Sequence, residues 1–276
     1  MNGSEGIFFD KMIVKKCIIL LLFLIGVYKR VSKRREKQVI ILEEVLNMNV
    51  ICQNARGFIY RNARPLDLAR WQYHFENGSR EAVLNALAYY QNEDGGFGHA
   101  LEADAWNPNS SPIQTWAATE ILREIGFADD THPIIMGILQ YLESGKNFGG
   151  KFWYNAIKSN KDYPHASWWH SESDSTCRED YNPTACLAGF IIRFAVKDSC
   201  LYKFGCRIAG EAFEQLISAE RQNDMHTTAC YIRMMQYIEE AEERNIIDMP
   251  TLKKIMRTSE KQYYPKYCRM GNIICL

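Results

Sequence analysis

Charge imbalance is the first thing this sequence lacks. Its 276 residues carry 33 Lys and Arg against 33 Asp and Glu, so the overall charge gives no support to a nucleic-acid partner, and none is expected. The nine cysteines form no CxxC pair and their number is odd, which argues against a disulfide framework and for reduced thiols in a cytoplasmic protein. Alternation of apolar and polar residues, the mark of β-strands, is almost absent. An all-α fold is therefore the economical prediction.

Familiar catalytic motifs are missing as well. The chain has no GxSxG nucleophile motif and no phosphate-cradling P-loop, and its GGFGHA cluster lies between helical patterns rather than after a strand. We therefore expect no cofactor. With 47% apolar residues and no internal linker, the chain is nevertheless long enough to bury one large core.

What the sequence does contain begins with a short apolar run, Cys17 to Tyr28, flanked by basic residues on both sides. A run of about 12 residues is short for a membrane helix, which needs about 20, although lysines that snorkel extend its reach. Residues 1–47 are therefore either an anchor, with membrane contact through residues 12–30, or an extension upstream of a domain that spans residues 48–276. If the run inserts, the larger basic cluster after it would hold that domain in the cytoplasm, so a cytoplasmic location is expected in either case.

Helical patterns separated by short polar corners fill the rest of the chain. Ser79 is placed to cap one helix, which would form a hairpin with the helix before it. Ser111 with Pro112, and Thr131 with Pro133, are placed to begin the next two. Further helices are expected at about residues 200–218, 225–243 and 250–263.

The most informative corner is QNEDGGFG, Gln91 to Gly98. Gly95 and Gly96 can adopt backbone angles that other residues avoid, so the chain can turn sharply there. The turn would let Phe97 fold back under the preceding helix while Asp94 bonds to free backbone amides. This stretch resembles the QW-type repeat of the terpenoid cyclase and protein prenyltransferase superfamily.

The resemblance extends on both sides of the corner. Gly96 to Leu122, GFGHALEADAWNPNSSPIQTWAATEIL, and Phe58 to Ser79, FIYRNARPLDLARWQYHFENGS, are similar to small bacterial proteins of the prenyltransferase-like repeat class. The similarity covers roughly residues 50–245 and implies an α/α toroid of stacked helical hairpins. The C-terminal tail contains no further glycine corner, so we expect the toroid to be incomplete at that end. The likeness implies an architecture more firmly than a reaction.

Internal repetition agrees with such an architecture. Gly95 to Phe97 recurs in looser form as Gly149 to Phe152, 54 residues later, and Asn107–Pro108 recurs as Asn182–Pro183, 75 residues later. In both copies the asparagine is placed to cap a helix of the inner wall. The difference of 21 residues indicates an insertion, which falls in Asn155 to Tyr181 and shows no helical period. Loops of this length in compact domains are often functional.

The first candidate site follows the glycine corner and comprises His99, Glu102, Asp104 and Trp106. Class II cyclases of the superfamily protonate an alkene with an aspartic acid that is kept neutral in an apolar cup. The resemblance therefore implies catalytic roles for Asp104, as the acid, and for Glu102, with His99 and Trp106 as ligand contacts. The DxDD pattern of those enzymes is absent. The alternative is structural, with both carboxylates bonded to backbone amides that hold the loop.

The insertion supplies the second candidate group. The paired Trp168 and Trp169 lie in a polar stretch and are hard to explain as core residues. We expect them to touch a ligand, together with His170 and, near the end of the insertion, Asp180. Core packing accounts for Trp153.

No metal site is expected. The prenyltransferases that this chain resembles use an Asp, Cys and His zinc site, but Asp180, Cys186 and His226 lack the close Asp and Cys spacing of that family. Four residues of the insertion match no standard metal motif and are better explained as part of a solvated polar loop: His165, His170, Asp174 and Cys177.

The expected function is binding of a hydrophobic, isoprenoid-like small molecule in a concave helical cavity, with prenyltransferase- or terpene cyclase-like chemistry if the protein is an enzyme. One alternative is a non-catalytic helical scaffold that holds a peptide or protein partner on a flat apolar surface. Another is a carbohydrate-active α/α barrel with paired carboxylates such as Glu102 and Asp180. The ligand hypotheses require Glu102 and Asp104 to point into a cavity, and the acid hypothesis is lost if their side chains bond only to local backbone. Nothing in the sequence indicates an oligomeric state.

Overall fold

The computed structural model describes residues 49–175, 180–218, 225–243 and 245–263, with side chains described as far as residue 257. The chain divides into two compact units, Met1–Asn62 with Lys266–Leu276, and Ala63–Pro265. The described part of the first unit is a helix over residues 49–62. The expected N-terminal extension, residues 1–47, lies outside the described residues.

Every regular element in the described ranges is helical, which confirms the all-α prediction. Pairing of β type there is limited to isolated bridges. Of the helices that the structure describes, none combines the length and the apolar character needed to cross a bilayer. The segment expected to contact a membrane, residues 12–30, is not among the described residues.

The second unit begins with two packed helices. α3, Pro65–Phe75, starts at a proline whose fixed φ suits the first helical position, and α4, Arg80–Ala88, follows it. Ser79 caps α4 as predicted, because its hydroxyl oxygen accepts the backbone amide of Ala82 at 3.1 Å. The two helices pack against each other through their buried residues.

α5, Pro112–Glu124, follows the glycine corner, and α6, Pro133–Glu143, comes next. Ser111 caps α5 as predicted, since its hydroxyl oxygen accepts the amide of Gln114 at 3.3 Å. A proline opens each helix, so sequence signals that act within one turn locate both starts.

The cap of α6 differs from the prediction. His132, and not Thr131, supplies it, because the Nδ1 atom of His132 accepts the amide of Ile134 at 3.2 Å. The hydroxyl of Thr131 donates instead to the Asp129 carboxylate at 2.7 Å, and its backbone amide donates to the same carboxylate at 3.0 Å. The threonine is therefore held in the preceding turn and is not available to cap the helix.

The remaining helices complete the described chain. Two short 3₁₀ helices lie in the insertion: η1, Lys158–Asp162, and η2, Ser167–Trp169. They are followed by α7, Thr184–Phe194, α8, Cys200–Ser218, α9, Met225–Glu240, and α10, Met249–Tyr263. α8 has its predicted bounds, whereas α9 ends before the predicted residue 243, where Glu242 turns the chain with a φ of 57°.

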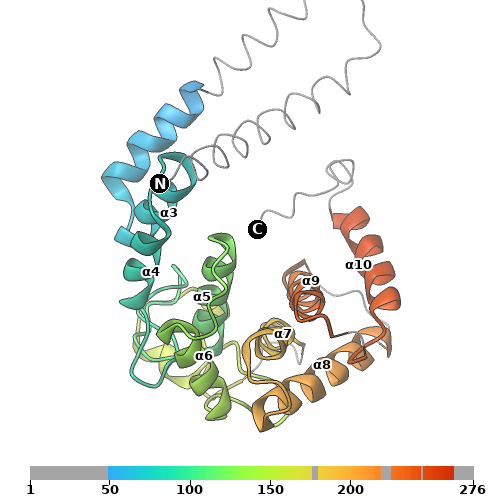
Figure 1. The fold of residues 1–276 in the computed structure, drawn as a ribbon. Helices are drawn as coiled ribbons and strands as arrows, with labels where there is room; N and C mark the ends of the chain where they lie inside the picture. Colours follow the sequence, from blue (N-terminus) through green and yellow to red (C-terminus); the bar gives the residue numbers. More distant parts are fainter. Residues whose placement is uncertain (1–48, 176–179, 219–224, 244, 264–276) are drawn as a thin grey trace, which may run out of the picture. The chain divides into compact units, whose positions relative to one another are not determined.

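α7 lies at the centre of the second unit. All of its side chains except that of Arg193 are buried, and it packs against α5, α6, α8 and α9 (Figure 1). α10 in turn packs against α9. Gly189 permits the close approach of α9, because a Cβ atom there would lie 2.8 Å from the Cα atom of Met234. Trp153 is fully buried in the same core, as predicted.

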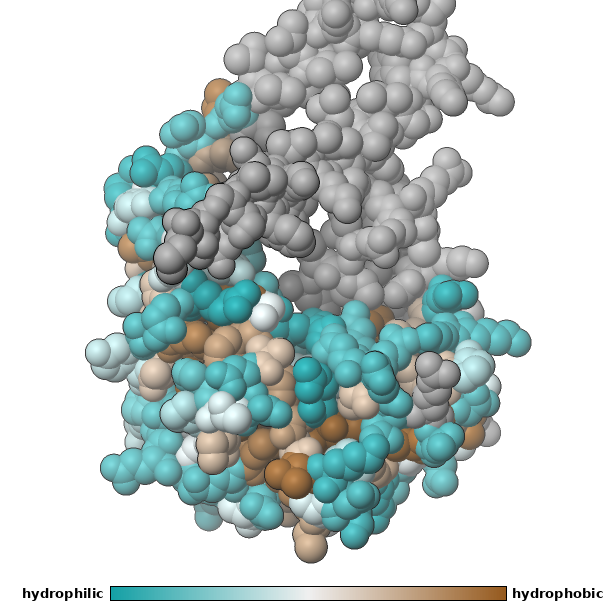
Figure 2. All heavy atoms as spheres, viewed as in Figure 1, coloured by the Kyte–Doolittle hydropathy of each residue, from teal (hydrophilic) through white to brown (hydrophobic). Residues whose placement is uncertain are grey.

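In the view of Figure 2, the coloured part of the surface is mostly polar. Hydrophilic side chains cover most of the face shown in Figure 2, and apolar side chains gather there only in small patches. Large exposed apolar side chains are spread over several elements, among them Phe75, Met136 and Ile217. Scattered apolar residues are normal on protein surfaces and do not mark a binding face.

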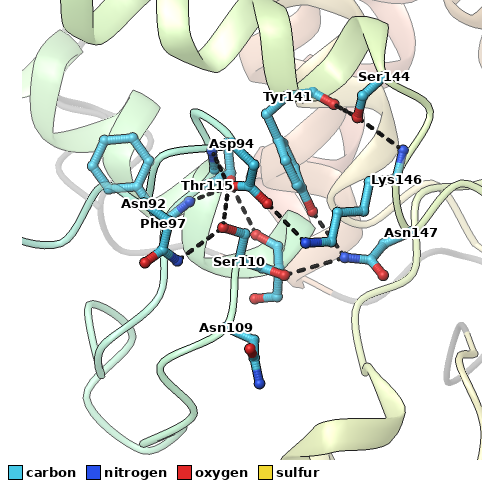
Figure 3. A network of polar contacts seen from close by, with 12 residues as sticks. Asn92, Asp94, Phe97, Asn109, Ser110, Thr115, Tyr141, Ser144, Lys146 and Asn147 are labelled. Atoms are coloured by element: carbon cyan, nitrogen blue, oxygen red, sulfur yellow. Dashed lines mark hydrogen bonds and ion pairs between the residues drawn. The ribbon is translucent and has the colours of Figure 1, made fainter.

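Asp94 holds the glycine corner. One of its carboxylate oxygens accepts the amide of Gly96 at 3.0 Å and the hydroxyl of Ser110 at 2.6 Å, and the other pairs with the Lys146 ammonium at 2.8 Å (Figure 3). The predicted bond from Asp94 to a free backbone amide is therefore confirmed. Because Ser110 precedes the cap of α5 and Lys146 follows α6, this carboxylate connects three segments of the chain.

Gly95 meets two requirements that other residues would not. Its φ of 84° lies in the left-handed region, and a Cβ atom there would collide with the carbonyl of Gly137 on α6. Gln91 supports the same contact, since its side-chain amide donates to the carbonyls of Gly95 at 3.0 Å and Ile134 at 3.1 Å. Phe97 is fully buried, as the predicted fold-back requires.

A second corner repeats these contacts in a register that differs from the predicted one. The amide of Phe97 donates to Thr115 Oγ1 at 3.1 Å, and the amide of Trp153 donates to Thr184 Oγ1 at 2.9 Å. Both aromatic side chains are fully buried, and each threonine belongs to the helix that follows its corner. The counterpart of Phe97 is thus Trp153 and not Phe152, because two residues separate the second glycine pair from the buried aromatic.

The predicted asparagine caps are not present. α5 is capped by Ser111, and α7 begins without a side-chain cap. Asn107 directs its amide to the buried Asn160 in the insertion, and the Asn182 side chain accepts the Cys230 thiol at 3.5 Å. Both asparagines therefore connect separate elements instead of satisfying a helix end.

Candidate functional site

Two loops that precede α5 and α7 meet at the candidate site. We name them the corner loop, residues 98–110, and the insertion loop, residues 155–175. Ala105 and His165 form an isolated antiparallel bridge between them, flanked by backbone hydrogen bonds of 2.8 and 2.9 Å. These contacts bring together the two groups of site residues that the sequence predicts separately.

Asp104 is held across this junction. One of its carboxylate oxygens accepts the indole N–H of Trp169 at 2.6 Å, and its backbone carbonyl accepts the amide of Ala166 at 2.8 Å. The indole lies 65 residues away in the sequence, so this carboxylate does more than bond to local backbone. Trp169 thereby fixes the orientation of Asp104.

The surroundings of Glu102 in the corner loop favour the protonated form of its carboxyl. Burial raises the pKa of its carboxyl, and the nearby Asp104 carboxylate raises that pKa further, while Arg64 and His226 act in the opposite direction. Arg64 precedes α3 and His226 belongs to the first turn of α9, so Glu102 faces groups from separate elements. A carboxyl with a raised pKa keeps its proton to a higher pH, which favours a role as a proton donor.

Gln114 anchors the corner loop, a role that the sequence does not reveal. This side chain is buried on α5, where its oxygen accepts the amide of Leu101 at 2.8 Å. Its nitrogen donates to the carbonyls of Ala105 at 3.3 Å and Asn107 at 3.1 Å. The Gln114 amide therefore fixes three backbone groups, one before Glu102 and two after Asp104.

Arg64 is a second support that sequence reasoning missed. His99 and Ala100 both have left-handed backbone, with φ of 59° and 62°, and Arg64 donates to the carbonyl of Ala100. The guanidinium is itself oriented by Asp67, whose carboxylate lies 2.7 Å from Nε. The His99 ring bonds to Asn92 Oδ1 at 2.9 Å, so it contacts the glycine corner.

A chain of amide side chains connects the two loops beneath these carboxyls. Asn107 donates to Asn160 Oδ1 at 2.9 Å, and Asn160 donates to the carbonyl of Trp169 at 2.9 Å. Both asparagines are buried. Because Trp169 also binds Asp104, the hydrogen bonds form a closed circuit through the corner loop, η1 and η2.

Two exposed tryptophans, one in each loop, form what we call the aromatic rim, Trp106 and Trp168. Their exposed fractions are 60% and 62%, which is high for so large an apolar side chain. The indole N–H of Trp106 donates to the carbonyl of Ala103 at 2.9 Å, so its ring is held in place. The rim therefore offers aromatic surface to a ligand.

His170 lies in contact with His165 within the insertion loop. Their rings are stacked with centroids 5.2 Å apart, and the Nδ1 atom of His170 is 3.0 Å from the Nε2 atom of His165. The other ring nitrogen of His170 lies 3.4 Å from the Glu172 carboxylate. This pair belongs to the same loop as Trp168 and Trp169.

Asp180 serves a different junction. One of its carboxylate oxygens accepts the amide of Asn182 at 3.1 Å, and the other accepts the hydroxyl of Thr227 at 3.0 Å. These bonds connect the segment before α7 to the first turn of α9. Both oxygens have partners, so the structure gives Asp180 a supporting role at the helix starts.

The zinc alternative finds no ready set of ligands. Cys186 is buried on α7 with its sulfur 3.5 Å from Glu120, and burial together with this carboxylate raises the pKa of the thiol well above its usual value. Asp174 accepts the amide of Lys158 at 2.8 Å, and Cys177 lies outside the described residues. In the described part of the chain, no three His, Cys, Asp or Glu side chains are placed to hold a metal ion together.

Ion pairs join the neighbouring faces of α5 and α9. The Arg233 guanidinium on α9 contacts both carboxylate oxygens of Glu120 on α5, at 2.5 to 2.9 Å. Farther along the same helices, Arg123 contacts both oxygens of Glu240 at 3.0 and 2.5 Å. These faces are therefore polar, whereas the hydrophobic-ligand hypothesis expects an apolar inner wall.

A hollow of about 250 Å³ lies near the C-terminal ends of α5, α7 and α9. Its lining mixes apolar and charged side chains: Thr119, Leu122, Arg123, Gly126, Phe127, Ala128, Phe190, Phe194, Tyr237 and Glu240. This volume is below the roughly 300–1,000 Å³ typical of pockets for drug-sized ligands. The hollow is thus suited to a small apolar group rather than to a long chain.

Comparison with known proteins adds no family to this description. No protein-family model matches the chain, and neither the curated proteins nor the solved structures contain a significant match.

Proposed function

We propose that the chain is a ligand-binding protein of the α/α-toroid type, in which α5, α7 and α9 form the inner wall and α6 and α8 lie outside it. The packing of α7 against all four of these helices supports this arrangement. So do the two corners, each of which donates a buried aromatic amide to a threonine of the next inner helix. The open end expected at the C-terminus lies beyond the described residues.

The proposed ligand is a carbohydrate, bound where the corner loop meets the insertion loop, with Glu102 as a general acid. One observation carries this proposal. Glu102, with its raised pKa, lies beside Asp104, whose carboxylate is fixed by the Trp169 indole, and the two exposed tryptophans of the aromatic rim belong to the same two loops. A pair of carboxyls with different environments can divide acid and carboxylate roles between them.

In the proposed reaction the Glu102 carboxyl gives its proton to the oxygen of a glycosidic bond as that bond breaks. The Asp104 carboxylate then stabilises the positive charge that develops on the sugar ring or activates a water molecule. Trp106 and Trp168 supply flat apolar surface on which the C–H face of a sugar ring can stack. This assignment places the acid at Glu102 and not at Asp104, the first choice from the sequence.

Polarity disfavours an isoprenoid bound along the proposed inner helices. A hydrocarbon chain along the inner helices would lie against the Glu120–Arg233 and Arg123–Glu240 ion pairs and remove them from water, which costs free energy without new hydrogen bonds. A hydroxylated ligand can exchange hydrogen bonds with such groups. On the face shown in Figure 2, the coloured apolar side chains form small patches and not the flat apolar surface that the peptide scaffold expects.

A hydrophobic ligand is the second candidate function, and only the apolar part of the hollow near the ends of α5, α7 and α9 favours it, because the Arg123–Glu240 ion pair lines the same hollow. Phe127, Phe190 and Phe194 line that hollow and offer an apolar surface. The proposal would place an isoprenoid-like group there, at a different place from the corner loop. Mass spectrometry of lipids that copurify with the full-length protein tests this second candidate directly.

The leading proposal is tested with a panel of oligosaccharides and aryl glycosides. We expect intrinsic tryptophan fluorescence to report saturable binding by the full-length protein, and product analysis to show bond cleavage. Glu102→Gln should lower kcat by about 100-fold or more while the dissociation constant changes little, because a general acid acts in the transition state. Trp106→Ala should weaken binding.

Matched controls separate these effects from damage to the fold. Glu93→Gln changes an exposed carboxyl of the glycine corner, and Tyr89→Ala removes an exposed ring at the C-cap of α4. Both should leave binding and turnover intact. The carbohydrate proposal is abandoned if no saccharide binds at millimolar concentration, or if Glu102→Gln turns over as fast as the Glu93→Gln control.

A further inference from the structure

The hollow near the C-terminal ends of α5, α7 and α9 has an aromatic floor. Phe190 on α7 and Tyr237 on α9 pack edge to face with ring centroids 5.9 Å apart, and the Phe194 ring lies 4.6 Å from that of Phe190. Phe190 and Tyr237 are only 1% and 2% exposed. The hollow measures about 250 Å³, so its floor offers room and aromatic surface to one small apolar group.

The more exposed part of the same lining is charged. The side chains of Arg123 and Glu240 are 23% and 43% exposed, far more than the rings of the floor. The Arg123 guanidinium also lies over the Tyr237 ring, with its central carbon 5.1 Å from the ring centroid. A positive and a negative group therefore lie beside each other at the mouth, in direct contact with the aromatic floor.

Both charged groups keep hydrogen-bonding capacity after they pair with each other. The two terminal nitrogens of Arg123 donate to the two carboxylate oxygens of Glu240 at 3.0 and 2.5 Å. The Nε atom of Arg123 has no hydrogen-bond partner in the part of the chain that the structure describes. A guanidinium has more N–H donors, and a carboxylate more acceptor positions, than this pair uses. Arg123 can therefore still bind a carboxylate, and Glu240 can still bind an ammonium group.

This combination fits a zwitterion better than a ligand with one charge or none. A fatty acid would be attracted by Arg123 but repelled by Glu240, and an amine would meet the reverse. An isoprenoid would fill the floor but would remove the ion pair from water without new hydrogen bonds. An α-amino acid carries its ammonium and its carboxylate on the same carbon atom. Both groups can thus reach the neighbouring Arg123 and Glu240 while the side chain enters the floor.

We propose that the hollow binds a free α-amino acid with an apolar side chain, such as phenylalanine or leucine. Arg123 donates to the carboxylate of this ligand, Glu240 accepts from its ammonium group, and its side chain packs against Phe190 and Phe194. The hollow lies near the C-terminal ends of α5 and α7, whereas the corner and insertion loops precede these helices. The inference is therefore independent of the carbohydrate proposal, and it replaces the isoprenoid as the occupant of this hollow.

Titration calorimetry of the full-length protein with L-phenylalanine and L-leucine tests the proposal. We expect one site per chain and a dissociation constant below about 1 mM, a modest affinity for a ligand of this size. Two analogues each lack one charge: 3-phenylpropionate has no ammonium group, and phenethylamine has no carboxylate. Each should bind at least about tenfold more weakly than phenylalanine, because a charge-assisted hydrogen bond is lost. Glycine, which has no apolar side chain, should show no measurable binding.

A variant at the mouth separates recognition of the ammonium group from damage to the fold. Glu240→Gln should weaken phenylalanine binding at least about tenfold but should not weaken 3-phenylpropionate, which makes no ammonium contact. Glu211→Gln, the control, breaks an exposed ion pair within α8 and should leave both affinities unchanged. Circular dichroism confirms that each variant is folded.

Three results would overturn the amino-acid proposal. The first is that neither phenylalanine nor leucine binds at millimolar concentration. The second is that 3-phenylpropionate binds as tightly as phenylalanine. The third is that farnesol, an isoprenoid alcohol, binds and phenylalanine does not displace it, which would favour the second candidate function. None of these results bears on the saccharide assays, which probe the corner and insertion loops.

Discussion

The raised pKa of Glu102, on which its proposed role as an acid depends, should also lower the stability of the folded protein at neutral pH. Its pKa in the folded protein lies above the ordinary 4.5, so the native state binds this proton more tightly than the unfolded chain does. Stability should therefore fall as the pH rises from about 4.5 through the folded pKa. Glu102→Gln should add about 1 kcal/mol at pH 7.5, as substitutions at strained site residues often do, and nothing at pH 4.

Urea denaturation of both proteins at the two pH values measures this difference. Glu93→Gln, at an exposed position of the glycine corner, should show no gain at either pH. A Glu102→Gln protein that is no more stable than the wild type at pH 7.5 would mean that the carboxyl is not strained in the native state. The acid role assigned to it would then lose its physical basis.

Asp94 has the opposite linkage. Burial acts to raise its pKa, but the hydrogen bonds from Lys146, Ser110 and the Gly96 amide act more strongly, and the net pKa is lowered. Its stabilisation is present above the unfolded value of 3.8 and disappears as the pH falls through the lower folded pKa. Asp94→Asn should cost about 1–2 kcal/mol at pH 7, because charge-assisted bonds become neutral ones. The cost should shrink below pH 3.8.

Thermal unfolding at several pH values measures that cost. Asp130→Asn provides the matched control, since it removes an exposed carboxylate from a loop. An Asp94→Asn protein that loses no more stability than Asp130→Asn at pH 7 would show that the corner does not depend on this charge. The network drawn in Figure 3 would then contribute little to the stability of a turn whose shape the glycines already fix.

At the scale of single elements, the sequence predicts those features, such as helix caps, whose interacting groups lie within one turn of each other. Ser79 and Ser111 cap their helices because the acceptor and the amide it binds lie three residues apart. Thr131 fails as a cap because a side chain two residues away, Asp129, competes for its hydroxyl. Alignment of the second corner on its glycines predicts Phe152 as the counterpart of Phe97, whereas the contact that defines this corner involves Trp153 and a threonine 31 residues later.

The candidate site shows the same limit. Glu102, Asp104 and Trp169 could be singled out from residue type and loop position alone. Gln114 and Arg64, which fix the corner loop, could not, because their partners lie 7 to 37 residues away and no local pattern marks them. The sequence also could not show that the Trp169 indole binds Asp104, since that contact depends on how two loops meet.

The two corners each contain a glycine with nearly the same φ, which allows the two positions to be compared. Gly95 and Gly150 have φ of 84° and 88°, but a Cβ atom on Gly95 would collide with the Gly137 carbonyl, and one on Gly150 would meet nothing within 4 Å. Gly150→Ala should cost only the left-handed backbone penalty of about 1–2 kcal/mol. Gly95→Ala should cost about 2 kcal/mol more, because α6 must move.

Chemical denaturation of the two variants measures both costs on one scale. The difference between them isolates the steric contact between the corner and α6, since the backbone penalty is common to both. Equal losses of stability would show that α6 yields freely and that the corner is not packed tightly against it.

At the scale of the whole molecule, α5 and α9 are joined across α7 by residues far apart in the sequence. Glu120 and Arg233 are separated by 113 positions, and their side chains are only 22% and 15% exposed. Arg233 also donates to Gln236 at 2.5 Å, which orients the guanidinium. The ion pair therefore holds two proposed inner helices at a fixed separation in addition to their packing against α7.

A double-mutant cycle measures this connection. Glu120→Gln and Arg233→Gln should each cost about 2–3 kcal/mol, because each leaves a half-buried charge without its partner. The double variant should recover part of that loss, which corresponds to a coupling energy of about 1–3 kcal/mol. The same cycle on Arg207 and Glu211, an exposed pair within α8, should give about 0.3–0.5 kcal/mol.

The comparison of the two cycles decides whether the inner helices are held together by charge. A coupling for Glu120 and Arg233 no larger than that of the α8 pair would show that packing on α7 alone sets their separation, and a hydrocarbon ligand could then displace the ion pair at little cost. A large coupling that weakens little in 0.5 M salt would mean that the polar inner face is fixed, because half-buried pairs are screened less than exposed ones. The preference for a hydroxylated ligand over an isoprenoid depends on that second outcome.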